Sequence, residues 1–155
     1  MAEKQKTLKS SFTIEGVGLH TGKITKLTVH PAEPNTWYVF KRMDIENQPS
    51  IKADVDNVIS TQRGTTLGND KMQVHTTEHL LAALYGMGVD NALIELDGPE
   101  IPILDGSSSY FIDAIESVGI QEQDAVKEYF VLKDNLAFED PEREAESHQL
   151  QCSMG

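Results

Sequence analysis

Apolar and polar residues alternate along the first part of the chain. The alternation spans residues 7–15 and returns at 24–30, on either side of the glycine-rich segment 16–22. A period of two places apolar side chains on one face of a strand, and clustered glycines favour a turn. We therefore predict two strands joined by a turn, a third strand at 37–42, and a mixed strand and loop segment at 51–59.

The apolar period becomes helical after residue 75. The residues that recur at the spacing of one helix face are Leu80, Leu81, Leu84 and Met87. Gly86 and Gly88 then act as stop signals. A second helix is predicted to begin near residues 105–107 and to end at Gly119. Its apolar face consists of Phe111, Ile115 and Val118.

Shorter apolar segments complete the order of elements. Residues 64–67 and 72–74 flank a Gly-Asn-Asp turn and predict a hairpin, and further strands are predicted at 92–96 and 129–132. Several strands followed by a helix, a strand, a helix and a strand fit the α+β class. The predicted architecture is a sheet with two helices packed on one face.

Composition narrows the class of protein. The chain has 155 residues, with 25 Asp and Glu against 13 Lys and Arg, and this net charge of −12 disfavours nucleic acid as a partner. No apolar run approaches the ~18 residues that span a bilayer, so we expect no integral membrane segment. A single cysteine and no apolar signal-peptide core favour the cytoplasm. We expect residues 1–138 to form one domain and residues 139–155 an acidic and polar tail without fixed structure.

Candidate chemistry lies at the start of the first helix, in the sequence His-Thr-Thr-Glu-His. With Thr76 as the N-cap, Glu78 and His79 fall in the first turn, where the helix dipole favours an ionised carboxylate and a neutral imidazole. Both forms suit a metal site. The alternative is that the pair only caps and packs the helix. An H-x-x-E-H zinc peptidase is a second alternative, but it requires one continuous helix from His75.

Two other segments carry polar residues in glycine-rich surroundings. His20 lies in the turn at residues 16–22, which precedes a strand and therefore does not match a dinucleotide-binding fingerprint. The alternative is that this turn is a simple hairpin in which His20 has no functional role. Asp105 is a candidate for a functional carboxylate, or for a cap of the second helix together with Ser107.

Four segments together resemble a known enzyme family. They are GVGLHTG at 16–22, ISTQRGTTL at 59–67, TTEHLLAALYGMGVDNALIEL at 76–96 and PEIPILDGSS at 99–108. In this order they are similar to the zinc-dependent UDP-3-O-acyl-N-acetylglucosamine deacetylase of lipid A biosynthesis. The resemblance runs from about Thr7 to about Pro141 and fades at about Arg143, so that it covers the first of the two similar domains of such enzymes.

The resemblance implies a role for individual residues. In that family each domain is a sheet with two helices against it, and the active site lies between the two domains. The match implies that Glu78 is the general base that acts on zinc-bound water, and that His79 is one of three protein ligands to the zinc. It further implies that His20 and Asp105 support the site. The residues expected on the substrate side are Leu19, Gln62 and Gly64.

The implied reaction is removal of the N-acetyl group from a UDP-sugar lipid, with zinc or ferrous iron as the metal. The family's remaining ligands come from a carboxy-terminal domain, which this chain is expected to lack as a truncated, frame-shifted or excised product. We therefore expect little activity from the chain alone, and an apolar face that favours self-association. The alternatives are the zinc peptidase, with His75 and an acid among residues 139–146 as further ligands, and a non-catalytic interaction domain.

Overall fold

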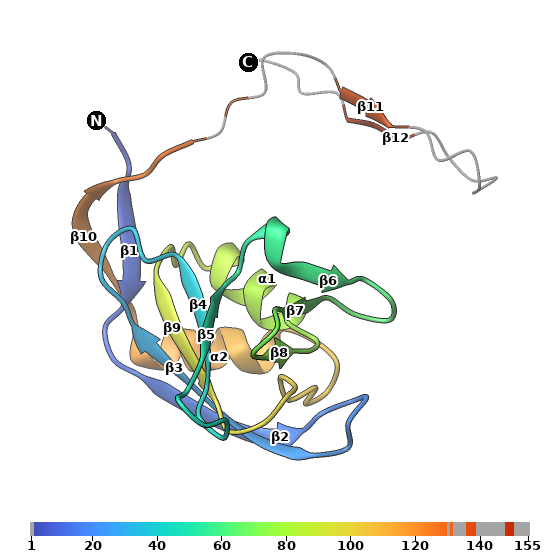
Figure 1. Cartoon of the computed structure of the whole chain (residues 1–155). Helices are drawn as coiled ribbons and strands as arrows, with labels where there is room; N and C mark the ends of the chain where they lie inside the picture. Colours follow the sequence, from blue (N-terminus) through green and yellow to red (C-terminus); the bar gives the residue numbers. More distant parts are fainter. Residues whose placement is uncertain (1, 130, 132–135, 139–147, 151–155) are drawn as a thin grey trace.

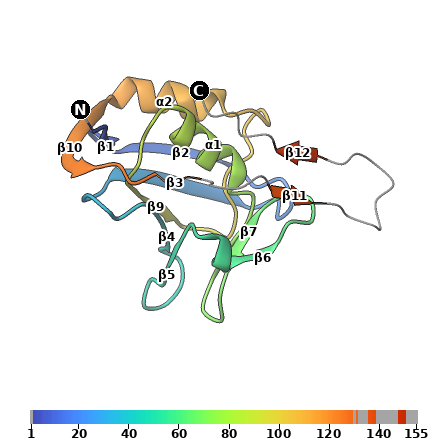
Figure 2. The same cartoon turned by 90° about the horizontal axis from the view of Figure 1, so that it is seen from above.

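The computed structural model describes residues 2–129, 131, 136–138 and 148–150. Its centre is a five-stranded sheet in the order β2-β3-β9-β4-β5, in which β4 and β9 are parallel and the other neighbours antiparallel. The strands are β2 (Phe12–Val17), β3 (Ile24–Pro31), β4 (Tyr38–Arg42), β5 (Ser50–Lys52) and β9 (Ala92–Leu96). Helices α1 (Glu78–Gly86) and α2 (Ser109–Val118) cover one face of this sheet (Figure 2). The predicted α+β architecture is confirmed.

Among the described residues, three smaller sheets accompany the central one. β1 (Lys4–Leu8) pairs with β10 (Ile120–Val126), and β11 (Leu136–Phe138) pairs with β12 (His148–Leu150). The pair β11–β12 lies apart from the central sheet in Figure 1. A three-stranded sheet consists of β6 (Val58–Ser60), β7 (Thr66–Gly68) and β8 (Gln73–Val74) and follows the 3-10 turn η1 (Val55–Asn57). The predicted hairpin at 64–74 corresponds to β7 and β8.

The core lies between the sheet and the two helices. β9 has the strict alternation of a strand with one face buried, since Ala92, Ile94 and Leu96 are fully inaccessible to solvent. From the helices, Leu80 and Leu84 of α1 meet Phe111 and Ile115 of α2 in the same cluster, as their spacing predicts. The apolar faces of the strands and of the helices therefore belong to a single core.

Three sequence predictions at element boundaries are wrong. The alternation at 7–15 is divided between β1 and β2, which belong to different sheets with a break at Ser10 and Ser11. The N-cap of α1 is Thr77 rather than Thr76, and α2 begins at Ser109 rather than near 105–107. The Thr76 hydroxyl, expected to cap α1, instead donates to Glu100, whereas the Ser107 hydroxyl accepts from the backbone N–H of Ser109 at the start of α2.

The last predicted strand is also misplaced. Tyr129 and Val131 are not in a strand, and positions 130 and 132 lie outside the described residues. The strand that follows α2 is β10, whose sequence IQEQDAV is mostly polar because it pairs only with β1 and lies beside solvent. For the predicted tail, residues 139–147 and 151–155 lie outside the described residues, and β12 falls within its range.

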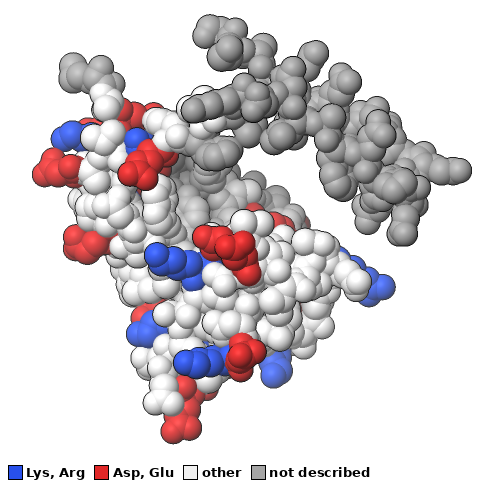
Figure 3. All heavy atoms as spheres, turned by 45° about the horizontal axis from the view of Figure 1, so that its top comes forward, with Lys and Arg blue, Asp and Glu red and all other residues white. Residues whose placement is uncertain are grey.

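Charge is mixed on the molecular surface. On the face shown in Figure 3, acidic and basic side chains lie interspersed rather than in separate patches. Within the described part of the chain, no helix has the length and apolar character needed to cross a membrane.

Candidate functional site

Four chain segments converge at the amino-terminal end of α1. They are the β2–β3 turn, the loop between β6 and β7, the residues that lead from β8 into α1, and the extended segment 99–103. The backbone joins them, since His75 N donates to Pro99 O at 2.9 Å and Thr77 N donates to Thr65 O at 3.2 Å. The polar groups of the candidate site therefore come from segments that are distant in sequence.

Glu78 and His79 lie side by side in the first turn of α1. Glu78 Oε2 accepts a hydrogen bond from the backbone N–H of Thr65 at 2.8 Å. Its other oxygen, Oε1, lies 3.9 Å from His79 Nε2. Both side chains are partly open to solvent, with 38% of Glu78 and 30% of His79 exposed. One carboxylate oxygen is thus held by the protein, while the other faces the imidazole and solvent.

His20 approaches the same carboxylate from the β2–β3 turn. Its Nε2 lies 3.0 Å from the carbonyl oxygen of Arg63, which can only accept, so the ring nitrogen donates. Gly64 lies between the two groups, because a Cβ there would be 3.2 Å from Glu78 Oε1 and 3.8 Å from His20 Nε2. Its φ of +150° is also one that side chains avoid. The structure therefore brings together the predicted residues His20, Gly64 and Glu78.

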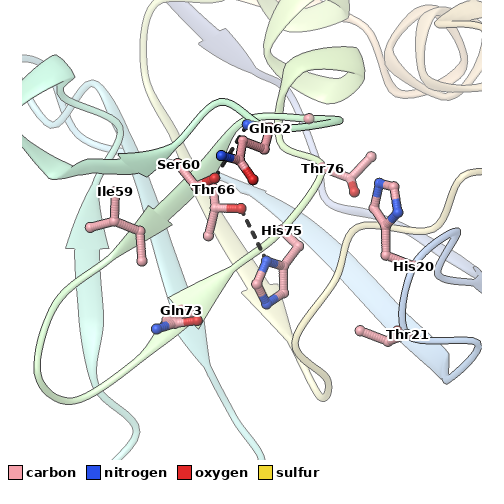
Figure 4. Close-up of a pocket in the computed structure, with 10 residues that line it drawn as sticks. His20, Thr21, Ile59, Ser60, Gln62, Thr66, Gln73, His75 and Thr76 are labelled. Atoms are coloured by element: carbon pink, nitrogen blue, oxygen red, sulfur yellow. Dashed lines mark hydrogen bonds between the residues drawn. The ribbon is translucent and has the colours of Figure 1, made fainter.

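A pocket of about 320 Å³ opens beside these groups (Figure 4). Gln62, His20 and His75 are among the residues that line it, and Thr66 Oγ1 lies 3.0 Å from His75 Nδ1. The pocket thus presents two imidazoles and several hydrogen-bonding side chains to solvent. Gln62 and Gly64, both expected on the substrate side, are among the residues that line this pocket.

Leu19 and Asp105 lie farther from this group. Leu19 is 60% exposed in the β2–β3 turn. Asp105 is exposed as well, and its Oδ1 accepts hydrogen bonds from the backbone N–H and the hydroxyl of Ser107. The hydrogen bond from the backbone N–H of Ser107 is the largest cause that lowers the pKa of Asp105, and the hydrogen bond from the Ser107 hydroxyl is the second. Among its described contacts, Asp105 shapes the turn before α2 rather than meeting Glu78.

His75 lies outside the helix. It forms an isolated bridge with Glu100, and the helix begins only at Glu78. His75 and His79 therefore do not share a helix face, and the geometry needed for an H-x-x-E-H peptidase is absent from this segment.

The metal donors in the described part of the chain are incomplete. One imidazole beside one carboxylate fits part of a zinc site. However, the residues that the structure describes contain no group of three or more His, Cys, Asp or Glu side chains that could hold a metal. A metal at His79 needs further ligands from elsewhere.

The sequence interpretation missed Glu100. This carboxylate is fully buried, and it accepts hydrogen bonds from His20 N, Thr21 N and Thr76 Oγ1. Burial alone raises the pKa of Glu100, but the bonds from these three donors outweigh burial and hold it below its ordinary value of 4.5. An acidic residue inside the apolar run PEIPI was the sequence feature that pointed to it.

Gly18 allows this carboxylate to approach the turn. A Cβ at Gly18 would lie 2.4 Å from Glu100 Oε2 and 2.7 Å from Thr21 Oγ1. We expect Gly18→Ala to lower the free energy of unfolding by about 1–3 kcal/mol, through overpacking. Gly86→Ala is the control, because a Cβ there has no neighbour within 4 Å and alanine favours the helix by up to about 1 kcal/mol. Urea unfolding measures both, and equal stability of the two variants would contradict the prediction.

Comparison with known proteins identifies relatives. The family model described as LpxC, UDP-3-O-acyl N-acetylglycosamine deacetylase, matches residues 5–152, and so extends beyond Arg143, where the resemblance was expected to fade. A bifunctional enzyme LpxC/FabZ of Bacteroides thetaiotaomicron is 50% identical over 137 residues, which cover 88% of this chain and 30% of the relative. A UDP-3-O-acyl-N-acetylglucosamine deacetylase of Geobacter sp. is 44% identical over 141 residues, or 91% of this chain and 46% of the relative.

The chain spans less than half the length of either relative. With the family model matching nearly all of its residues, the chain belongs to the LpxC family of UDP-3-O-acyl N-acetylglycosamine deacetylases.

Proposed function

We propose that this chain supplies the general base and one metal ligand of a deacetylase that removes the N-acetyl group from UDP-3-O-acyl-N-acetylglucosamine in the cytoplasm. The observation that carries the proposal is the geometry of Glu78. One of its oxygens is bound by Thr65 N at 2.8 Å, and the other lies 3.9 Å from His79 Nε2. A general base needs such an oriented carboxylate within reach of the water that it deprotonates.

The metal would be held in part by His79. Zinc, when bound, supplies Lewis-acid chemistry. Glu78 Oε1 accepts a proton from the water that attacks the acetamido carbonyl, while the Thr65 N–H keeps Oε2 in place. As the C–N bond breaks, acetate leaves and the amine nitrogen would take a proton from a general acid supplied by the carboxy-terminal domain. His20 holds the loop at Arg63 and Gly64 against Glu78. The base therefore keeps a fixed position relative to the metal ligand.

The remaining parts of the site are proposed to come from a carboxy-terminal domain. The reasons are that the described residues contain no group of three donors that could hold a metal, and that both relatives are longer than this chain. The chain by itself is then expected to have little or no turnover. Tyr85 on α1 is 81% exposed and Tyr110 on α2 is 55% exposed, which supports the prediction that the isolated chain self-associates.

The test joins this chain to the carboxy-terminal half of the Geobacter deacetylase. We expect the joined protein to hold about one zinc and to release acetate from UDP-3-O-acyl-N-acetylglucosamine, and the isolated chain to do neither. Metal analysis of His79→Ala should show loss of zinc from the joined protein. His75→Ala is the matched control and should retain it.

Two outcomes would contradict the proposal. One tightly held zinc on the isolated chain, lost in His79→Ala, would show a complete site within this chain. Failure of the joined protein to release acetate, although folded and metal-bound, would favour the non-catalytic interaction domain.

A further inference from the structure

We infer that Glu100 is a positioning residue, whose carboxylate holds the turn that carries His20 against the residues that lead into α1. The inference rests on the proposed function, because it assigns to Glu100 the placement of the groups around Glu78. Among the hydrogen bonds of the described residues, Glu100 makes none with Glu78, and it acts through the backbone and through His20.

The carboxylate joins two distant segments with hydrogen bonds. Oε2 accepts from Thr21 N at 2.8 Å, and His20 N lies 3.0 Å from Oε1 and 3.2 Å from Oε2. Oε1 also accepts from the hydroxyl of Thr76 at 2.8 Å. The first two donors belong to the β2–β3 turn, and the third belongs to the segment before α1. One buried side chain is therefore the link between them.

The site around Glu100 requires an ionised acceptor. A carboxylate offers only lone pairs, so it satisfies two backbone N–H groups and a hydroxyl at once. Hydrogen bonds to an ionised acceptor are stronger than those between neutral groups, and more so where water is excluded. An amide at this position would turn an N–H group towards donors, and would leave at least one of them unsatisfied.

The backbone of Glu100 is fixed on both sides. Towards α1, Ile101 N donates to His75 O at 3.1 Å, next to the bond between His75 N and Pro99 O. Towards the turn, Ile103 N donates to Val17 O at 3.0 Å. The segment 99–103 thus lies between the two elements that the Glu100 side chain joins. Because its backbone is held on both sides, the position of the Glu100 carboxylate is fixed as well.

Strain at Thr76 supports the same role. This residue has a φ of +59°, in the left-handed region that β-branched residues avoid. Such a conformation persists only where the surroundings hold it. Thr76 is buried, and its hydroxyl bond to Glu100 is the side-chain contact that holds it immediately before the helix.

The positioning reaches Glu78 through His20. The His20 ring donates to Arg63 O, and the next residue, Gly64, lies against Glu78 Oε1. Release of the turn at His20 would therefore loosen the loop whose Thr65 N–H holds the other oxygen of Glu78. Small displacements at such a base are costly for the reaction.

The experiment measures amide hydrogen exchange by NMR in the full chain with Glu100→Gln. We expect the amides of His20 and Thr21 to exchange faster by roughly tenfold or more, because both lose a buried charged acceptor. The amides of Ile94 and Leu96 in β9 should keep their protection. Glu95→Gln is the matched control, because the ion-pair partners of Glu95 in the described part of the chain are His30 and Lys41, outside the turn. Unchanged protection at His20 and Thr21 in Glu100→Gln would overturn the inference.

Thr76→Val serves as a milder second variant. It preserves the shape and the β-branch of Thr76 and removes only the hydroxyl bond, so the chain should fold even if Glu100→Gln does not. We expect faster exchange at Thr77 and at His20, by a smaller factor than in Glu100→Gln. No change at either amide would contradict a link through Glu100.

The catalytic consequence is measured in the joined protein. Glu100→Gln should lower kcat by roughly ten- to a hundredfold and change KM by a smaller factor, since the base is displaced and the loop that carries Gln62 is loosened with it. If the amides of His20 and Thr21 exchanged faster but kcat were unchanged, Glu100 would only stabilise the fold, and the positioning role would be overturned. An inactive joined wild-type protein would defeat the proposed function, and the exchange data would still decide whether Glu100 holds the turn.

Discussion

Glu78→Gln in the joined protein lowers kcat for acetate release by about 10²–10⁴-fold, while KM stays close to that of the wild type. Glutamine has the shape of glutamate, and its carbonyl oxygen still accepts the hydrogen bond that Thr65 N donates at 2.8 Å. The amide cannot take a proton from water at neutral pH. The effect is therefore confined to the chemical step, and steady-state kinetics measures it directly.

Two comparisons make this prediction specific. Metal analysis should show that Glu78→Gln retains its zinc, in contrast to His79→Ala, because the base and the ligand are different residues. Glu116→Gln, at an exposed position on α2, removes the same charge far from the site and should leave kcat unchanged. If Glu78→Gln released acetate at the wild-type rate, Glu78 would not be the general base, and the proposed mechanism would be wrong.

Phe111→Ala destabilises the isolated chain by about 3–5 kcal/mol, the range for truncation of a buried aromatic side chain. Phe111 is fully buried on α2, in the cluster that includes Phe40 of β4 and Leu84 of α1. Its removal leaves a cavity between the helices and the sheet. Because a small domain has a total stability of only about 5–15 kcal/mol, a large share of it would be lost.

The neighbouring residue provides the control. Tyr110 precedes Phe111 on the same helix and is 55% exposed, so Tyr110→Ala should change the free energy of unfolding by less than about 1 kcal/mol. Urea unfolding at low protein concentration compares the two variants without interference from self-association. A loss of similar size in both would show that α2 does not pack as the structure has it.

The elements with a clear period were predictable from the chain itself. β9 alternates buried and half-buried positions from Ala92 to Leu96, and Leu80 and Leu84 recur on the buried face of α1. In both, the backbone conformation sets which side chains share a face, so the pattern of burial can be read from neighbouring residues alone. The pairing of Glu78 with His79 was predictable for the same reason, since adjacency at a helix start is a local property.

The errors share a different cause. β10 is polar, and its identity as a strand depends on β1, which lies more than a hundred positions earlier in the chain. The polar residues 9–11 separate strands of two sheets, although the loose alternation resumes at Phe12 in the same register, as if one strand continued. Strand pairing is a long-range choice, because the hydrogen bonds of a strand are made to other segments and not within it.

The local sequence determined the helices and strands that have a clear period, and the adjacency of Glu78 and His79. Only the tertiary structure decided which of the remaining polar residues join that pair. Thr76 was predicted to cap a helix and instead binds Glu100, while Asp105 forms a local turn with Ser107. Glu100 had no recognisable role in the chain because its donors, His20, Thr21 and Thr76, lie 80, 79 and 24 residues away. A buried carboxylate is stable only where such donors converge, and their convergence is a property of the folded molecule.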